Sequence, residues 1–139
     1  MSYYCEKTDV EAVFGASNIE KWADLDSDGD AGKIAARIEA AIVFAHNRVD
    51  DLLRGGPYAI PIVGVAPHTI KDAAAKLAGV WLYEARGVED FDESSGEMLH
   101  RLSPIKRDAE RTLAHIRGGA LRLDLPEART TPEVVTEDS

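Results

Sequence analysis

The chain has 139 residues, a mass of 15.1 kDa and a net charge of −9, with 45% hydrophobic and 29% charged residues. This is the size and composition of one globular domain, and no apolar run approaches the roughly 20 residues that a transmembrane helix needs. An excess of carboxylates opposes binding to phosphates, which argues against tight DNA binding by the monomer. The chain shows no basic, apolar leader, so we expect it in the cytoplasm of the cell that makes it. Its single cysteine, Cys5, excludes an intramolecular disulfide, and we expect the thiol to be buried or idle.

Two short helices are predicted in the acidic first 30 residues, which hold two basic and eight acidic side chains. Thr8 and Glu11 have the spacing of a capping box, which predicts a helix over residues 9–14. The same pattern recurs before a second helix over about 18–23.

The strongest periodicity begins at Ala31 and predicts one long central helix over residues 31–54. Its apolar residues recur at intervals of three and four: Ile34, Ile38, Ala41, Ile42, Ala45, Val49, Leu52 and Leu53. The proline- and glycine-rich residues 55–67, "GGPYAIPIVGVAP", predict an extended, partly buried connection with room for one short strand.

Two further helices are predicted after this connection. One begins near Pro67 and ends near Arg86, and its four alanines would let a neighbouring helix approach closely. The other has Ser103 as its N-cap and Pro104 at its first position, with one turn of helix before it, and ends at residues 118–119. These elements predict an all-α domain of four to five helices over residues 1–125. Residues 126–139 are expected to form a flexible acidic tail.

An aspartate cluster precedes the long helix and resembles the first half of a calcium-binding loop. Its members alternate along the chain and are Asp24, Asp26, Asp28 and Asp30. The twelfth position, which requires a bidentate carboxylate, is Ala35. We therefore favour a tight turn in which Asp28 or Asp30 caps the long helix. A weak Ca²⁺ or Mg²⁺ site is the alternative; no other cofactor is expected.

No catalytic constellation is apparent in the sequence. His46 and Asp50 lie four residues apart and share a helix face, which is ligand spacing, but nothing completes a metal site, so a surface pair is the preferred interpretation. A regulatory cation-binding module built on the aspartate cluster is the main rival to a structural role, and a small enzyme with a metal at His46 and Asp50 is the third class.

Opposite charges are concentrated in two regions and suggest a contact surface, although a solvated helix face is the simpler interpretation. The basic candidates lie near the C-terminus and are Arg101, Lys106, Arg107, Arg111 and Arg117, with Arg122 beyond them. The acidic candidates precede them and are Glu89, Asp90, Asp92 and Glu93. Such regions suit copies of one chain that meet side by side and close into a ring.

The order of several segments resembles the Mu-like prophage connector family. These segments are "TDVEAVFG", "DLDSDGD", "DDLLRGGPYAIPI", "VAPHTIKDAAAKLAGVWLYEARG" and "RDAERTLAHIRGGALRL", and the resemblance covers about residues 1–125. It implies a structural protein of the neck of a tailed bacteriophage virion, one copy of a dodecameric ring between the portal protein and a tail-side neck or tail terminator protein. DNA would pass through this ring without specific binding. The family has no assigned catalytic residues, so the resemblance implies none here.

Overall fold

Five helices and no β-strand make up the described part of the chain. The computed structural model describes residues 3–25, 27–85, 93–121 and 123, and of residues 93–100 it describes the backbone. In chain order the helices are α1 (Lys7–Phe14), α2 (Ala16–Ala23), α3 (Ala31–Leu53), α4 (His68–Glu84) and α5 (Glu93–Arg117). The predicted all-α class is confirmed.

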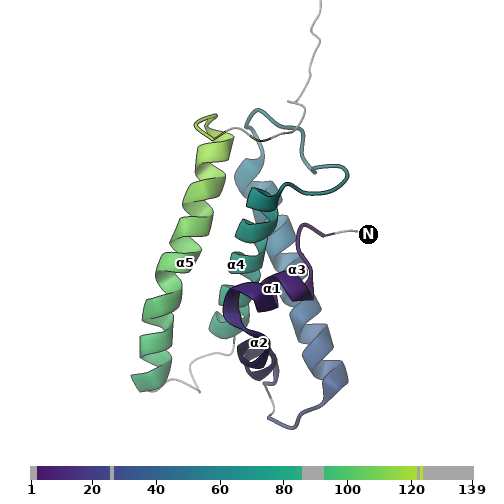
Figure 1. Cartoon of the computed structure of the whole chain (residues 1–139), viewed down its shortest axis with the longest axis vertical. Helices are drawn as coiled ribbons and strands as arrows, with labels where there is room; N and C mark the ends of the chain where they lie inside the picture. Colours follow the sequence, from purple (N-terminus) through teal and green to yellow (C-terminus); the bar gives the residue numbers. More distant parts are fainter. Residues whose placement is uncertain (1–2, 26, 86–92, 122, 124–139) are drawn as a thin grey trace, which may run out of the picture.

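The three long helices run along the long axis of the molecule, and α1 and α2 lie across its lower half (Figure 1). Helix α3 packs against all four other helices, and so does the central helix α4. It accepts so many neighbours since its alanines carry little bulk, and Ala73, Ala74 and Ala78 are all buried. A Cβ atom at Gly79 would overlap the ring of Phe14, so α1 crosses α4 where the side chain is smallest. The predicted close approach to this helix is confirmed.

Helix α3 follows the predicted register. Seven of the eight residues of its apolar stripe are buried, and Leu52 is partly buried. Asp30 is its N-cap, because the Asp30 carboxylate accepts hydrogen bonds from the backbone N–H groups of Gly32 (2.9 Å) and Lys33 (3.2 Å). The prediction that an aspartate of the cluster caps this helix is therefore confirmed.

The connection between α3 and α4 is extended and partly buried, as predicted, and it contains no strand in the part of the chain described here. The buried Tyr58 hydroxyl accepts a hydrogen bond from the backbone N–H of Leu123 (2.7 Å). A Cβ atom at Gly56 would lie 2.8 Å from the Arg117 carbonyl oxygen. The connection and the end of α5 therefore pack backbone against backbone.

Three predicted helix starts are wrong. Helix α2 begins at Ala16 with Gly15 as its N-cap, so Ser17 lies inside the helix and does not cap it, because the turn at Gly15 (φ +93°) already separates α1 from α2. Helix α1 begins at Lys7, because the carboxylate of Asp9 accepts the backbone N–H of Glu6 (2.8 Å) and moves the cap two residues ahead of Thr8. Helix α5 is continuous from Glu93 through Pro104, so Ser103 is not an N-cap. The buried Leu102 shows why: the turn before Pro104 packs into the core, which offsets the hydrogen bond that proline cannot donate.

Candidate functional site

The aspartate cluster forms a tight loop whose carboxylates bind backbone N–H groups. Asp24 accepts hydrogen bonds from the N–H groups of Asp28 (3.2 Å) and Gly29 (3.1 Å), and Asp28 accepts one from Asp30 (3.0 Å). The second oxygen of Asp28 lies 3.2 Å from Lys33 Nζ. These hydrogen bonds and the lysine lower the pKa of the Asp28 carboxyl. The described aspartates thus shape the turn before α3.

This loop does not assemble a first shell of metal ligands from the residues that are described. Asp26 lies outside them, and the remaining three carboxylates are each engaged with the backbone. No group of three or more His, Cys, Asp or Glu side chains in the described ranges could hold a metal ion.

His46 and Asp50 are buried in α3, so their interpretation as a surface pair is wrong. They are 5% and 8% exposed, and His46 Nε2 lies 3.7 Å from Asp50 Oδ2. The hydroxyl of Tyr4 donates a hydrogen bond of 2.5 Å to Asp50 Oδ1 and accepts one of 2.8 Å from the backbone N–H of Ile62. The ring of Tyr4 also lies 4.1 Å, centroid to centroid, from that of His46.

This buried polar cluster joins three segments that are far apart in sequence. Tyr4 belongs to the N-terminal segment, Asp50 to α3 and Ile62 to the connection. Burial and the hydrogen bond to Asp50 raise the pKa of Tyr4, so the hydroxyl keeps its proton. Both Asp50 oxygens therefore face partners within the chain, which is a structural arrangement. Sequence reasoning missed Tyr4, because nothing local indicates a contact 46 residues away.

The basic candidates on α5 fall into two groups. Lys106 lies 3.5 Å from Glu84 Oε1 on α4, so one basic candidate pairs within its own chain. Arg101, Arg107 and Arg111 are exposed, and no ion pair joins them to the described part of the chain. Arg117 is also exposed, in the last turn of α5, where positive charge favours the helix dipole.

Most of the acidic candidates lie outside the described residues. Glu89, Asp90 and Asp92 lie outside the described residues, as do Arg122 and the predicted tail, and only the backbone of Glu93 is described, as the first residue of α5. Their role in a contact stays a prediction.

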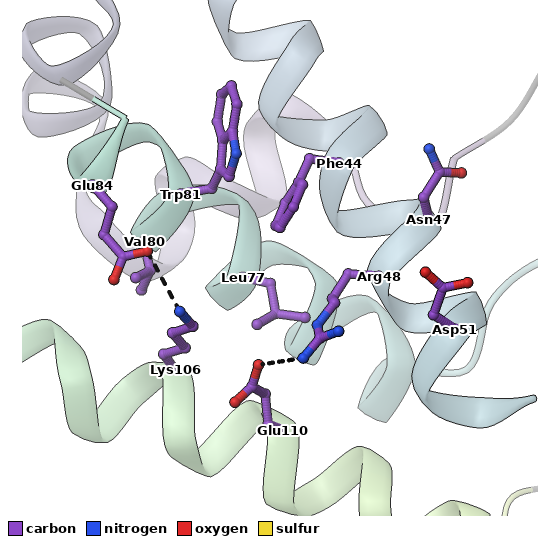
Figure 2. A pocket seen from close by; sticks show the side chains of 10 residues that line it. All are labelled: Phe44, Asn47, Arg48, Asp51, Leu77, Val80, Trp81, Glu84, Lys106 and Glu110. Atoms are coloured by element: carbon purple, nitrogen blue, oxygen red, sulfur yellow. Dashed lines mark hydrogen bonds and ion pairs between the residues drawn. The ribbon is translucent and has the colours of Figure 1, made fainter. Parts of the chain in front are cut away.

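A groove of about 390 Å³ lies between α3, α4 and α5. Figure 2 shows Phe44 and Trp81 on one side of it, with ring centroids 5.6 Å apart and planes inclined by 24°. The buried side chains of Leu77 and Val80 form an apolar floor. In the sequence Trp81 belongs to the apolar stripe of its helix, and no local pattern indicates that Phe44 of another helix lies beside it.

Two ion pairs at the rim of the groove join α5 to the helices on its other side. Arg48 of α3 lies 3.3 Å from Glu110 of α5, and Lys106 of α5 pairs with Glu84 of α4 (Figure 2). Asn47 and Asp51 complete the polar lining. The groove is therefore apolar at its floor, and most of its charges are paired with one another.

None of the helices in the described ranges combines the length and the apolarity needed to cross a membrane. The chain matches no curated protein and no solved structure. A family model described as "Bacteriophage Mu, Gp36" matches residues 4–138, which includes most of the predicted tail as well as the helical domain. The match spans nearly the whole sequence, and the chain therefore belongs to the bacteriophage Mu Gp36 family of phage proteins.

Proposed function

We propose that this chain is a structural head-to-tail connector of a tailed phage or phage-like particle. Copies of it form a ring, twelve in number by the resemblance described above, between the portal protein and a tail-side neck or tail terminator protein. The ring acts by docking and carries no catalytic residues. Membership of a phage family and an all-α fold with an exposed basic helix face support this proposal.

The observation that carries the proposal is the set of exposed arginines on α5. Arg107 and Arg111 are four residues apart and share a helix face, and Arg101 is exposed about 1.7 turns before Arg107. Like charges at this spacing repel each other by a few tenths of a kcal/mol. A carboxylate-rich partner removes this cost, and arginine is well suited to bind carboxylates with both of its terminal nitrogens.

The partner in the ring is the neighbouring copy. Glu89, Asp90, Asp92 and Glu93 supply a run of carboxylates that can face the arginines of the next subunit. Such a contact joins two different patches, so it is heterologous and propagates around a ring.

DNA must pass through such a ring without adhering to it. The first 30 residues hold eight of the acidic side chains, and Glu6, Glu20 and Asp28 among them are exposed. Carboxylates at the wall of the channel repel phosphates, so we place part of this acidic region toward the bore. A ring whose bore consisted mainly of Lys and Arg would contradict this placement.

The test is to mix the purified chain with the portal protein of the same particle and to image the mixture by cryo-electron microscopy. We expect a ring of density at the tail-facing end of the portal that accommodates α3, α4 and α5. The absence of that density, together with the absence of this chain from purified particles, would contradict the connector function.

A further inference from the structure

Two nearly fully exposed valines form the tip of the connection between α3 and α4. Val63 and Val65 are 90% and 88% exposed and flank Gly64, whose φ of +87° makes the sharp turn between them. The other exposed large hydrophobic side chains among the described residues are at most 43% exposed. Single exposed apolar residues are ordinary, whereas two nearly fully exposed valines at one turn concentrate apolar surface in one place.

The base of this tip is fixed, so the valines cannot fold back onto the core. The backbone N–H of Ile62 donates to the Tyr4 hydroxyl, and Ile60, Ile62 and Ala66 pack against the buried core. The connection starts beside the end of α5, and its loop then extends away from α5 at the end of the molecule where α4 begins (Figure 1).

The groove between α3, α4 and α5 is complementary to an uncharged apolar tip. Residues 55–67 contain no charged side chain. In the groove, Arg48 is paired with Glu110 and Lys106 with Glu84, so an uncharged occupant leaves no rim charge without a partner. The acidic residues 126–139, with four carboxylates and one arginine, would instead place negative charge beside the carboxylates already there.

The tip of a given copy is too far from the aromatic part of its own groove to occupy it. The tip precedes His68, and Trp81 lies 13 residues further along α4, which is roughly 20 Å at 1.5 Å per residue. The Lys106 and Glu110 side chains place the groove next to α5, whereas the loop of the connection extends away from α5 (Figures 1 and 2).

We propose that the Val63–Val65 tip of one copy binds in the α3–α4–α5 groove of a second copy, between Phe44, Trp81 and the apolar floor. Tip and groove are different patches, so the contact is heterologous and continues from copy to copy. The stacked aromatic pair supplies the rigid apolar anchor on which such interfaces depend. The inference rests on the proposed function in one respect, namely that this contact is one of those that join subunits in the ring.

Disulfide trapping in solution tests the contact without requiring a ring. We would mix Val65→Cys and Asn47→Cys chains at high concentration under mild oxidation and identify the 65–47 cross-link by mass spectrometry. Asn47 is exposed and lines the groove, and the buried native Cys5 does not compete. In the control, Asn47→Cys chains are mixed with Leu25→Cys chains. Leu25 is exposed and belongs neither to the tip nor to the groove. We expect the 65–47 product to exceed the control product by about tenfold, and equal yields would overturn the inference.

A second measurement uses variants at exposed side chains, where a substitution removes no packing in the core. The double substitution Val63→Asp and Val65→Asp should weaken self-association, measured by sedimentation, by about tenfold or more, because carboxylates would be buried against an apolar floor. Leu25→Asp is the matched control and should leave self-association unchanged. Equal effects of the two changes would overturn the inference.

The two proposals can fail separately. A ring on the portal whose subunits give no 65–47 cross-link would leave the connector function standing and overturn the tip-and-groove contact. A specific 65–47 cross-link, with no ring on the portal and no copy of this chain in purified particles, would support the contact and contradict the connector function.

Discussion

Asp50 illustrates how one buried charge can organise a small helical protein. Asp50 is a buried residue of α3, and its carboxylate faces both the Tyr4 hydroxyl and the His46 ring. A buried carboxylate is costly unless hydrogen bonds compensate for lost water. Tyr4 provides one such bond and at the same time binds the backbone of Ile62. The N-terminal segment is therefore required for the connection to hold its shape.

Removing the Tyr4 hydroxyl should destabilise the fold. Tyr4→Phe leaves Asp50 Oδ1 and the Ile62 N–H without this partner, and we expect a loss of about 1–3 kcal/mol in the free energy of unfolding, measured with urea. Tyr3→Phe is the control, because no hydrogen bond of the Tyr3 hydroxyl joins it to the described residues. Equal losses in the two variants would contradict a specific role for Tyr4.

The buried Cys5 thiol makes the protein sensitive to alkali. Burial, and then the nearby carboxylates of Asp9 and Glu6, raise the pKa of Cys5 from 9.0 to about 12. The folded chain therefore keeps the proton when the unfolded chain loses it. This contribution to stability is fully present below pH 9.0 and is lost as the pH rises toward 12, at about 1.4 kcal/mol per pH unit. Between pH 9 and 10, Cys5→Ala should make the free energy of unfolding fall less steeply with pH than it does in the unchanged chain. An equal slope in the two chains would contradict a contribution from Cys5.

The engaged carboxylates of the aspartate loop lead us to expect weak binding of Ca²⁺. Asp24, Asp28 and Asp30 already accept hydrogen bonds from backbone N–H groups, and a cation would find no bidentate carboxylate at residue 35, which is Ala35. Calorimetric titration with Ca²⁺ should give binding no tighter than about millimolar. Submicromolar binding accompanied by a folding change would favour the rival, a regulatory cation-binding module.

At the scale of elements, α5 depends on its contacts more than on its local sequence. Ser103 and Pro104 have the form of a helix start, yet the helix runs through both. Leu102 precedes them and is buried together with Ala109, Leu113 and Ile116. Full burial of a leucine is worth about 1.5–3 kcal/mol, which is comparable to the cost of proline inside a helix.

Two substitutions in α5 separate the continuous helix from a helix that starts at Ser103. Ser103→Ala should change the free energy of unfolding by less than about 0.5 kcal/mol, whereas the loss of an N-cap would cost about 1 kcal/mol. Pro104→Ala should stabilise the chain by about 1–2 kcal/mol, because alanine restores the missing donor. Thermal or urea unfolding measures both. If Ser103→Ala instead destabilised the chain by about 1 kcal/mol, Ser103 would act as an N-cap and the continuous helix would be contradicted.

At the scale of the whole molecule, ion pairs join α5 to α3 and α4, while the exposed arginines on its outer face take no part in them. Lys76 of α4 lies 3.0 Å from Asp72 and 3.2 Å from Asp108 of α5, and these carboxylates raise the pKa of Lys76. Such exposed pairs contribute about 0–1 kcal/mol each, so they orient α5 more than they stabilise it. Arg107 and Arg111 take no part in these pairs.

Reversing the charge of these arginines should abolish assembly and spare the fold. We expect Arg107→Glu with Arg111→Glu to prevent ring formation on the portal while the far-ultraviolet circular dichroism stays unchanged, because like charges would then face one another. Lys7→Glu with Lys21→Glu makes the same change in net charge on α1 and α2 and should leave assembly intact. Equal loss in the two double variants would point to net charge and contradict a specific docking face.

The sequence by itself was sufficient for the helices that carry their own periodicity. The apolar stripe of α3, the stop at Gly118 and Gly119 and the thin alanine face of α4 are local features, since each is set by spacing of three or four residues or by backbone freedom at glycine. The all-α class followed from these features.

Tertiary structure alone decided the features that depend on distant partners. The burial of His46 and Asp50 requires Tyr4, the continuity of α5 requires a core for Leu102, and the groove requires Phe44 to meet Trp81 from another helix. Helical periodicity identifies the face of a helix that is buried, but it contains no information about which residue of another segment will lie against that face. That choice is made when the helices pack together.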